Sequence, residues 1–186
     1  MKSGIPILRL TQEEYLETER AREVRREYLG GLVYAMAGSS AEHNQIAGNL
    51  FSRLRAHLRD KVCQIFASDM KVKIEAIDAY YYPDVVVSFD PSDNAEHFIT
   101  KPVLIVEVTS PVTAATDRRE KLLAYQQIST LLEYVTVAQD EIEVQVYRKA
   151  RAVRWWESTL VPDDVLELES VGLSLILKDL YEGVQL

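Results

Sequence analysis

Two apolar stretches in the middle of the chain decide its fold: Tyr82-Pro83-Asp84-Val85-Val86-Val87-Ser88-Phe89 and Pro102-Val103-Leu104-Ile105-Val106-Glu107-Val108-Thr109. Continuous apolar runs of this length are typical of central strands that are covered on both faces. Pro83 has no amide proton to give to a neighbouring strand, so the first strand is expected to begin after it. The sequence therefore predicts strands over residues 84–89 and 103–109.

Each of these two strands carries one carboxylate, Asp84 in the first and Glu107 in the second. Alternate side chains of a strand share a face, so Asp84 lies with Val86 and Glu107 lies with Ile105. If the strands are neighbours, the carboxylates converge, and two like charges are costly unless a cation lies between them. Magnesium suits such a site because it needs only one or two carboxylates, and the Val108 carbonyl can supply another oxygen ligand. The alternative is that Asp84 lies in a turn and Glu107 forms a salt bridge.

Capping and turn signals organise the first third of the chain. Thr11 followed by Glu14 is a capping-box pattern, which predicts a short helix. Gly30-Gly31 separates residues 23–29 from residues 32–37, and glycine tolerates the positive φ angles of a hairpin turn. The segment Ser39-Ser40-Ala41-Glu42 starts a second helix of about five turns, expected to cover one face of a sheet. Its apolar side chains recur every four residues: Ile46, Leu50, Leu54 and Leu58.

After the second helix the hydrophobic period changes from four to two. Residues 70–75 alternate between apolar and charged side chains, which predicts a half-exposed strand. Asp117 is expected to cap a helix that runs to about residue 128. Strands follow over residues 133–138 and 142–148, and short extended segments near 153–156 and 173–175 finish the chain. This order of elements predicts one α/β sandwich around a mixed sheet.

The composition limits the classes of protein to consider. The 186 residues fit one domain spanning the whole chain, and 47% are hydrophobic. Because no apolar run approaches the roughly 20 residues needed to cross a bilayer, and no secretory signal is visible, we expect no membrane partner and a cytoplasmic location. Cys63 is the only cysteine, which excludes a multi-cysteine zinc site. The net charge of -8 weighs against the open basic surface of proteins that bind duplex DNA.

Lys121 is the cation best placed to join the two carboxylates. On a helix that begins at Asp117, residues 117, 121 and 125 lie on one side. A lysine on that side can extend over apolar surface and bring its ammonium group to a phosphate near the strand ends. The alternative is an exposed lysine that pairs with Asp117.

Several of these segments occur together in one known family. They are Tyr82 to Val87, Pro102 to Pro111, Asp117, Lys121, Tyr125 and Glu133-Tyr134, with Ser68-Asp69, His43 and the segment from Glu27 to Gly31 before them and Tyr181-Glu182-Gly183 after them. Over nearly its whole length the chain resembles the Uma-type restriction endonucleases, which belong to the PD-(D/E)XK nuclease superfamily.

The resemblance implies a restriction-endonuclease-like fold with a mixed central sheet flanked by helices. It also implies a metal-dependent endonuclease that hydrolyses phosphodiester bonds in nucleic acid, with DNA expected before RNA. Asp84 and Glu107 would be the ligands of Mg²⁺, for which Mn²⁺ can substitute, and Lys121 would be the catalytic lysine. A homodimer is expected as well, because many nucleases of this superfamily cut two strands with two subunits.

One position departs from the superfamily pattern, which has a lysine two residues after the glutamate. Thr109 occupies that position here and carries no charge. Lys121 is the best substitute, because the Uma-type pattern also has a lysine on the following helix. The alternative is a noncatalytic interaction module that kept the fold and lost the reaction, which Thr109 and the acidic net charge favour.

Three further residues match the family pattern as accessory members of the site. Glu27 is either a third carboxylate near the metal or an exposed hairpin residue. His43, in the first turn of its helix, either faces the cleft or only caps and packs. Asp69 either contributes to the site or is only a turn residue after Ser68.

Overall fold

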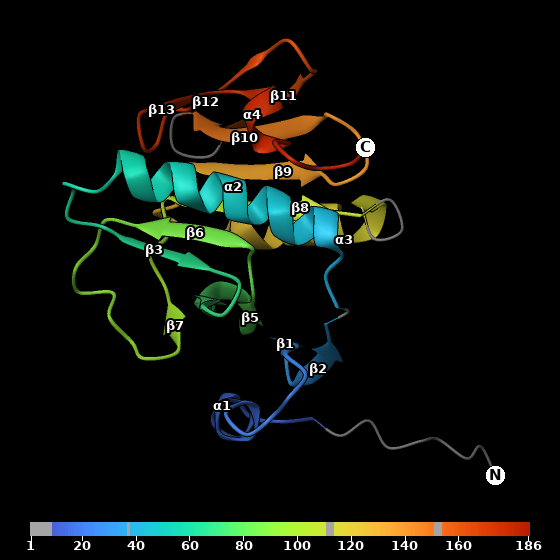
Figure 1. Cartoon of the computed structure of the whole chain (residues 1–186). Helices are drawn as coiled ribbons and strands as arrows, with labels where there is room; N and C mark the ends of the chain where they lie inside the picture. Colours follow the sequence, from blue (N-terminus) through green and yellow to red (C-terminus); the bar gives the residue numbers. More distant parts are fainter. Residues whose placement is uncertain (1–8, 37, 111–113, 151–153) are drawn as a thin grey trace.

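The computed structural model describes residues 9–36, 38–110, 114–150 and 154–186, without the side chains of residues 114–118. Its strands form a six-stranded, a five-stranded and a two-stranded sheet. In Figure 1 the six-stranded sheet extends from β3 in the middle of the molecule to β11 near the top, where the two-stranded sheet also lies, and the five-stranded sheet lies below it.

The six-stranded sheet has the strand order β11-β10-β9-β8-β6-β3. The strands are β3 (Gln64–Ala67), β6 (Val85–Ser88), β8 (Leu104–Thr109), β9 (Glu133–Ala138), β10 (Val144–Ala150) and β11 (Arg154–Leu160). Strands β8 and β9 are parallel, and the other adjacent pairs are antiparallel. The two apolar stretches become β6 and β8, which are buried neighbours in the sheet. The predicted mixed central sheet is therefore confirmed.

Two helices cover opposite faces of this sheet (Figure 1). Helix α2 (Ala41–His57) begins after Ser40, whose hydroxyl accepts a hydrogen bond from the amide of His43. Helix α3 (Ala114–Tyr125) lies on the other face. The side chains of β8 alternate between the two faces, since Val106 packs in the cluster under α2 and Ile105 packs with Tyr125 under α3.

The five-stranded sheet has the order β2-β1-β5-β4-β7 and stands beside helix α1 (Gln12–Glu19). Gly30 and Gly31 adopt φ angles of 54° and 93°, which permit the predicted hairpin turn between the first two strands. Tyr15 from α1 stacks on Tyr28 with ring centroids 5.1 Å apart. The strands are β1 (Arg26–Leu29), β2 (Leu32–Ala35), β4 (Lys71–Ile74), β5 (Ala79–Tyr81) and β7 (Phe98–Ile99).

The connection between the two large sheets positions the candidate site. Strand β5 ends at Tyr81 and β6 begins at Val85, so residues 82–84 cross from the five-stranded to the six-stranded sheet. The proline at residue 83 stands outside both strands, where no ladder hydrogen bond is required of it. Asp84 consequently lies where both sheets meet.

Glu133 connects the C-terminal segment to the six-stranded sheet by hydrogen bonds. This segment contains β12 (Val165–Leu168), β13 (Leu173–Ile176) and the short helix α4 (Leu177–Leu180). The buried carboxylate of Glu133 accepts hydrogen bonds from Arg148 Nε at 2.7 Å and from the Ser170 amide at 2.8 Å. Glu133, at the start of β9, therefore has a structural role.

Some local predictions are wrong. Helix α3 begins by Ala114, before Asp117, so Asp117 is not its N-cap; the helix includes Ala114 and Ala115, and alanine is the strongest helix former. Lys71 was expected on the exposed face of its strand but is buried, with its ammonium 5.0 Å from the centroid of the Tyr82 ring. The sequence also gave no signal for β7, whose two residues are too few to show a hydrophobic period.

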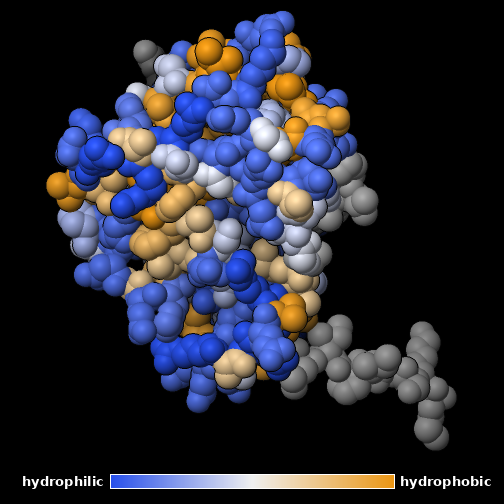
Figure 2. All heavy atoms as spheres, viewed as in Figure 1, coloured by the Kyte–Doolittle hydropathy of each residue, from blue (hydrophilic) through white to orange (hydrophobic). Residues whose placement is uncertain are grey.

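The described residues include no helix that is long and apolar enough to span a membrane. The face of the molecule seen in Figure 2 is mostly hydrophilic, with apolar residues exposed in small groups.

Candidate active site

Asp84 lies at the end of the β6–β8 pair. Val85 pairs with Val106 in antiparallel register, so Asp84 and Glu107 are the next residues along the two strands. The amide of Val108 donates a hydrogen bond to Asp84 Oδ2 at 2.7 Å. The backbone of β8 thus holds the carboxylate that precedes β6, and both acidic side chains lie at one end of the pair.

His43 faces the cleft and contacts Asp84. Its Nε2 atom is 2.8 Å from Asp84 Oδ1, and both side chains are largely buried. Burial lowers the pKa of His43, but the hydrogen bond and charge of Asp84, with the charge of Glu107, outweigh this effect and raise it. The His43 ring therefore binds Oδ1 of Asp84, while the Val108 amide binds Oδ2.

Glu107 is buried against helix α3. The Nζ atom of Lys121 lies 3.2 Å from Glu107 Oε1, and the Tyr125 hydroxyl donates a hydrogen bond to the same oxygen at 2.8 Å. Lys121 and Tyr125 are four residues apart and so project from the same side of α3. The lysine thus reaches the strand end across the apolar surface of the sheet.

Glu27 brings a third carboxylate from the five-stranded sheet. Its Oε1 atom lies 2.9 Å from Lys121 Nζ, and its side chain is only 18% exposed. The Lys121 ammonium also lies 5.8 Å from the centroid of the Tyr81 ring. Glu27 is therefore a cleft residue and not an exposed hairpin residue.

These side chains line a cleft of about 1070 Å³. Its walls come from the β1–β2 hairpin, the start of α2, the ends of β6 and β8, and α3. The ionisable groups that line it are mostly acidic: Glu23, Glu27, Asp84, Glu107 and Glu120, against Arg25, His43 and Lys121. The cleft consequently has many oxygen atoms that can bind a cation and few positive charges that can bind an anion.

Burial and crowding of like charges change the pKa of Glu107. Burial, together with the carboxylates of Asp84 and Glu27, raises the pKa of Glu107 to about 7, against the opposing effect of Lys121 and the Tyr125 hydroxyl. Burial lowers the pKa of Lys121, but Glu107 and Glu27 outweigh this effect and raise it. The ammonium group is therefore charged at neutral pH, whereas Glu107 exchanges its proton near neutrality.

The raised pKa of Glu107 predicts a pH-dependent stability difference. Between about pH 4.5 and 7 the folded protein holds a proton on Glu107 that the unfolded chain has lost, so its free energy of unfolding falls as the pH rises. Glu107→Gln removes this dependence. In metal-free buffer we expect the free energy of unfolding of the variant to increase relative to that of the wild type as the pH rises from 5 to 8, by at most about 3 kcal/mol. Thermal unfolding at both pH values measures the gain, and parallel pH profiles would contradict it.

The donor set fits a small divalent cation. The described residues hold no group of three or more His, Cys, Asp and Glu side chains arranged around one metal position. Two carboxylates with backbone and water oxygens are, however, the kind of set that magnesium uses. The Thr109 carbonyl accepts from Gln139 on the β9 side, whereas the Val108 amide points to Asp84, so the Val108 carbonyl points toward Asp84 as well. Asp84, Glu107 and this carbonyl are the candidate ligands.

Other predicted residues have different positions. Asp69 is exposed and forms an ion pair with Arg25 at 2.5 Å, so its carboxylate does not join the cluster. Thr109 lines the cleft with a hydroxyl that lies 3.5 Å from the Val137 carbonyl. The hydroxyl of Tyr125 binds Glu107, a role that sequence reasoning missed, since it placed Tyr125 only beside Lys121. The spacing of four between these two residues was the signal for it.

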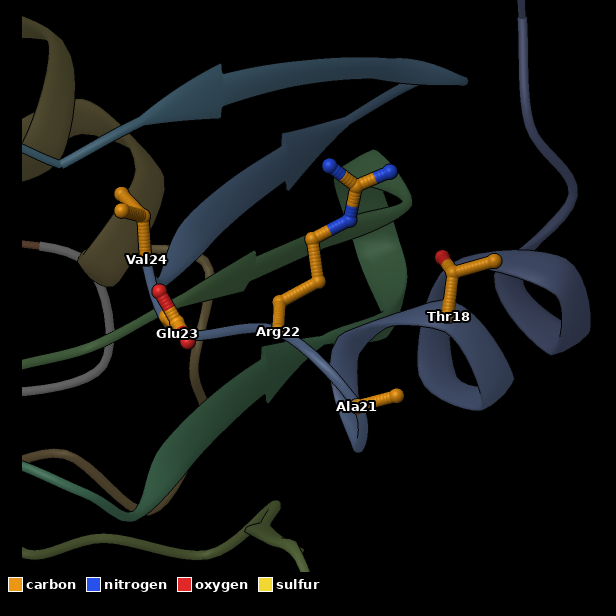
Figure 3. A pocket seen from close by; sticks show the side chains of 5 residues that line it. All are labelled: Thr18, Ala21, Arg22, Glu23 and Val24. Carbon is orange, nitrogen blue, oxygen red and sulfur yellow. The ribbon is translucent and has the colours of Figure 1, made fainter.

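A second hollow of about 540 Å³ lies on the segment between α1 and β1 (Figure 3). Its lining consists of Thr18, Ala21, Arg22, Glu23 and Val24, which Figure 3 shows along one stretch of chain. It contains a single carboxylate and none of the residues around Asp84. Reactive groups therefore converge in the larger cleft and not in this hollow.

Comparisons with known proteins agree with this architecture. The Uma2 family model, described as "Putative restriction endonuclease", matches residues 12–178. An uncharacterised protein of Synechocystis sp. is 37% identical over 180 residues, which cover 96% of this chain and 95% of that protein. A second uncharacterised protein of the same organism is 34% identical over 158 residues, which cover 83% of this chain and 89% of that protein.

A solved structure has the same fold. It is the crystal structure of a protein from Anabaena variabilis described as a putative nuclease belonging to DUF820, with a TM-score of 0.74 and 19% identity, and the match covers 95% of this chain and 99% of that one. The restriction-endonuclease-like fold predicted from the sequence is therefore confirmed. Since the family model matches most of the chain, from α1 to α4, the protein is a member of the Uma2 family.

Proposed function

We propose that this protein is a magnesium-dependent nuclease that hydrolyses phosphodiester bonds in nucleic acid, with DNA as the expected substrate and Mn²⁺ as a substitute metal. One observation carries the proposal: Asp84 and Glu107 come from adjoining strands to one cleft, where Lys121 lies 3.2 Å from Glu107. The description of the family, "Putative restriction endonuclease", names the same class of reaction.

Each residue has a distinct part in this proposal. Asp84, Glu107 and the Val108 carbonyl would hold the metal, which supplies a more acidic water nucleophile and positive charge for the phosphate oxygens. His43 keeps Asp84 oriented through the 2.8 Å contact with Oδ1. Lys121 brings a permanent positive charge to where charge develops on the phosphate, because its pKa is raised.

The competing proposal is a noncatalytic interaction module with the same fold. It is favoured by Thr109, which stands where the superfamily has its lysine, and by the acidic lining of the cleft. The two proposals differ in what they require of Asp84 and Glu107. A nuclease needs them to bind metal, whereas a binding module does not.

Metal titration followed by thermal unfolding tests the proposal. We expect Mg²⁺ or Mn²⁺ to stabilise the wild type by about 2.7 kcal/mol at a concentration 100 times the dissociation constant. Asp84→Asn and Glu107→Gln should both abolish this stabilisation. Asp69→Asn is the matched control, because it removes an exposed carboxylate that lies outside the cluster, and it should respond as the wild type does. An unchanged metal response in Asp84→Asn and Glu107→Gln would refute the nuclease proposal.

The homodimer, the cytoplasmic location and the single domain stay predictions. The oligomeric state can be measured by analytical ultracentrifugation of the full chain at several concentrations.

A further inference from the structure

Tyr34 differs from the other tyrosines on the cleft wall. It is 50% exposed, whereas Tyr81, Tyr82 and Tyr134 are at most 7% exposed. The buried rings contact other side chains of the core, as in the edge-on pair of Tyr81 and Tyr125 with centroids 5.7 Å apart. Tyr34 therefore offers a ligand in the cleft an aromatic surface that the buried rings cannot offer.

The hairpin register places Tyr34 beside the acidic cluster. Tyr34 lies directly opposite Glu27 in the β1–β2 pair. Side chains directly opposite each other in an antiparallel pair share one face, with Cβ atoms about 5 Å apart. Glu27 contacts Lys121 at 2.9 Å, and Lys121 contacts Glu107 at 3.2 Å. The Tyr34 side chain is consequently beside Glu27, which contacts the lysine that would receive the reacting phosphate.

Apolar side chains line the same cleft as Tyr34. Val24 is 55% exposed, and Leu29 and Met36 line the cleft from the same hairpin region. Figure 3 shows Val24 where the chain enters β1. An apolar surface around an aromatic ring suits the flat face of a nucleobase.

The same cleft has few positive charges that could bind the phosphates of a nucleic-acid backbone. Five carboxylates line it, against one arginine, one lysine and one histidine. The arginine, Arg25, is already paired with Asp69 and donates to the Ser68 carbonyl at 3.2 Å. A duplex presents two phosphate strands and keeps its bases stacked inside, so it would meet repulsion here without the stacking contact.

We propose that the cleft takes a single nucleic-acid strand, and that the base beside the scissile phosphate stacks on Tyr34. This inference rests on the proposed nuclease function and names its substrate class. A single strand brings fewer phosphates into the acidic cleft and leaves its bases free to stack, which provides binding energy that the few cations do not.

Binding of matched DNA oligonucleotides tests the inference. The Glu107→Gln protein serves as the background, so that the substrate persists, and fluorescence anisotropy compares a single strand with the duplex of the same sequence. We expect tighter binding of the single strand. Tyr34→Ala should weaken it by about 5- to 150-fold, and Tyr34→Phe, which keeps the ring, should leave it within about 2-fold. Trp156→Ala is the matched control, because Trp156 is also an exposed aromatic on an edge strand but lies outside the cleft lining.

Steady-state hydrolysis by the otherwise wild-type protein separates stacking from chemistry. Tyr34→Ala should raise KM for the single strand more than it lowers kcat, whereas Trp156→Ala should change neither. Equal affinity of the background protein for duplex and single strand, or equal affinities of Tyr34→Ala and Trp156→Ala for the single strand, would overturn the inference. If either of these equal affinities is found and the protein still cleaves duplex DNA, only the inference fails. If the protein responds to no metal and cleaves no nucleic acid, the proposed function fails and the inference fails with it.

Discussion

Replacement of Glu107 by glutamine is expected to lower the rate of metal-dependent phosphodiester hydrolysis by about 100-fold or more. The amide keeps the size of the side chain and its oxygen can still accept hydrogen bonds from Lys121 and Tyr125, so the cleft keeps its shape. The change removes the negative charge that the cation needs. Initial rates of cleavage with Mg²⁺ and with Mn²⁺ measure the loss, and Asp84→Asn should show a loss of similar size.

Glu120→Gln is the control for the charge of the cleft. Glu120 is exposed, lines the same cleft, and precedes Lys121 on α3. Its replacement removes one negative charge without removing a candidate ligand, and should leave the rate within about 3-fold, as expected for a surface charge. Equal losses in Glu120→Gln and Glu107→Gln would show that the total charge matters and not the position of the carboxylate. Full activity of Glu107→Gln would refute its role as a ligand.

Replacement of Lys121 by methionine is the second change with a large expected effect. The side chain keeps most of its apolar length and loses the ammonium group that lies 2.9 Å from Glu27 and 3.2 Å from Glu107. Because a preorganised positive charge in a buried site contributes to transition-state stabilisation, we expect the hydrolytic rate to fall by about 100-fold. Metal-dependent thermal stabilisation should persist, since both candidate ligands remain. Full hydrolytic activity of Lys121→Met would reject the proposed role of the lysine.

Thr109→Lys in the Lys121→Met background sharpens this test. Residues 107 and 109 of β8 share one face of the strand, so a lysine at residue 109 would project to the side of Glu107, as in the superfamily pattern. We expect this second change to recover about 10-fold of the lost rate. A further loss of rate would mean that the cleft accepts a lysine side chain only from α3.

Much of the fold follows from local sequence patterns. The two apolar runs specify β6 and β8 because only buried strands tolerate such sequences, and Gly30-Gly31 specifies the hairpin because the turn needs positive φ angles. The start of α3 was misplaced because Asp117 has the chemistry of a cap, whereas residues 114–116 continue the helix in front of it. The residue at which a helix or strand begins depends on such competition between local signals, whereas the presence of the helix or strand does not depend on it.

The sequence by itself determined the candidate side chains for the proposed chemistry: Asp84, Glu107 and Lys121, on two apolar strands and a following helix. Only the tertiary structure decided that His43 binds Asp84, that Glu27 pairs with Lys121, that Asp69 points away, and that Tyr34 stands beside the cluster. The physical reason is that the hairpin, helix α2 and strand β6 are distant in sequence. Their approach is fixed by burial of the whole core, and no local period or spacing encodes it.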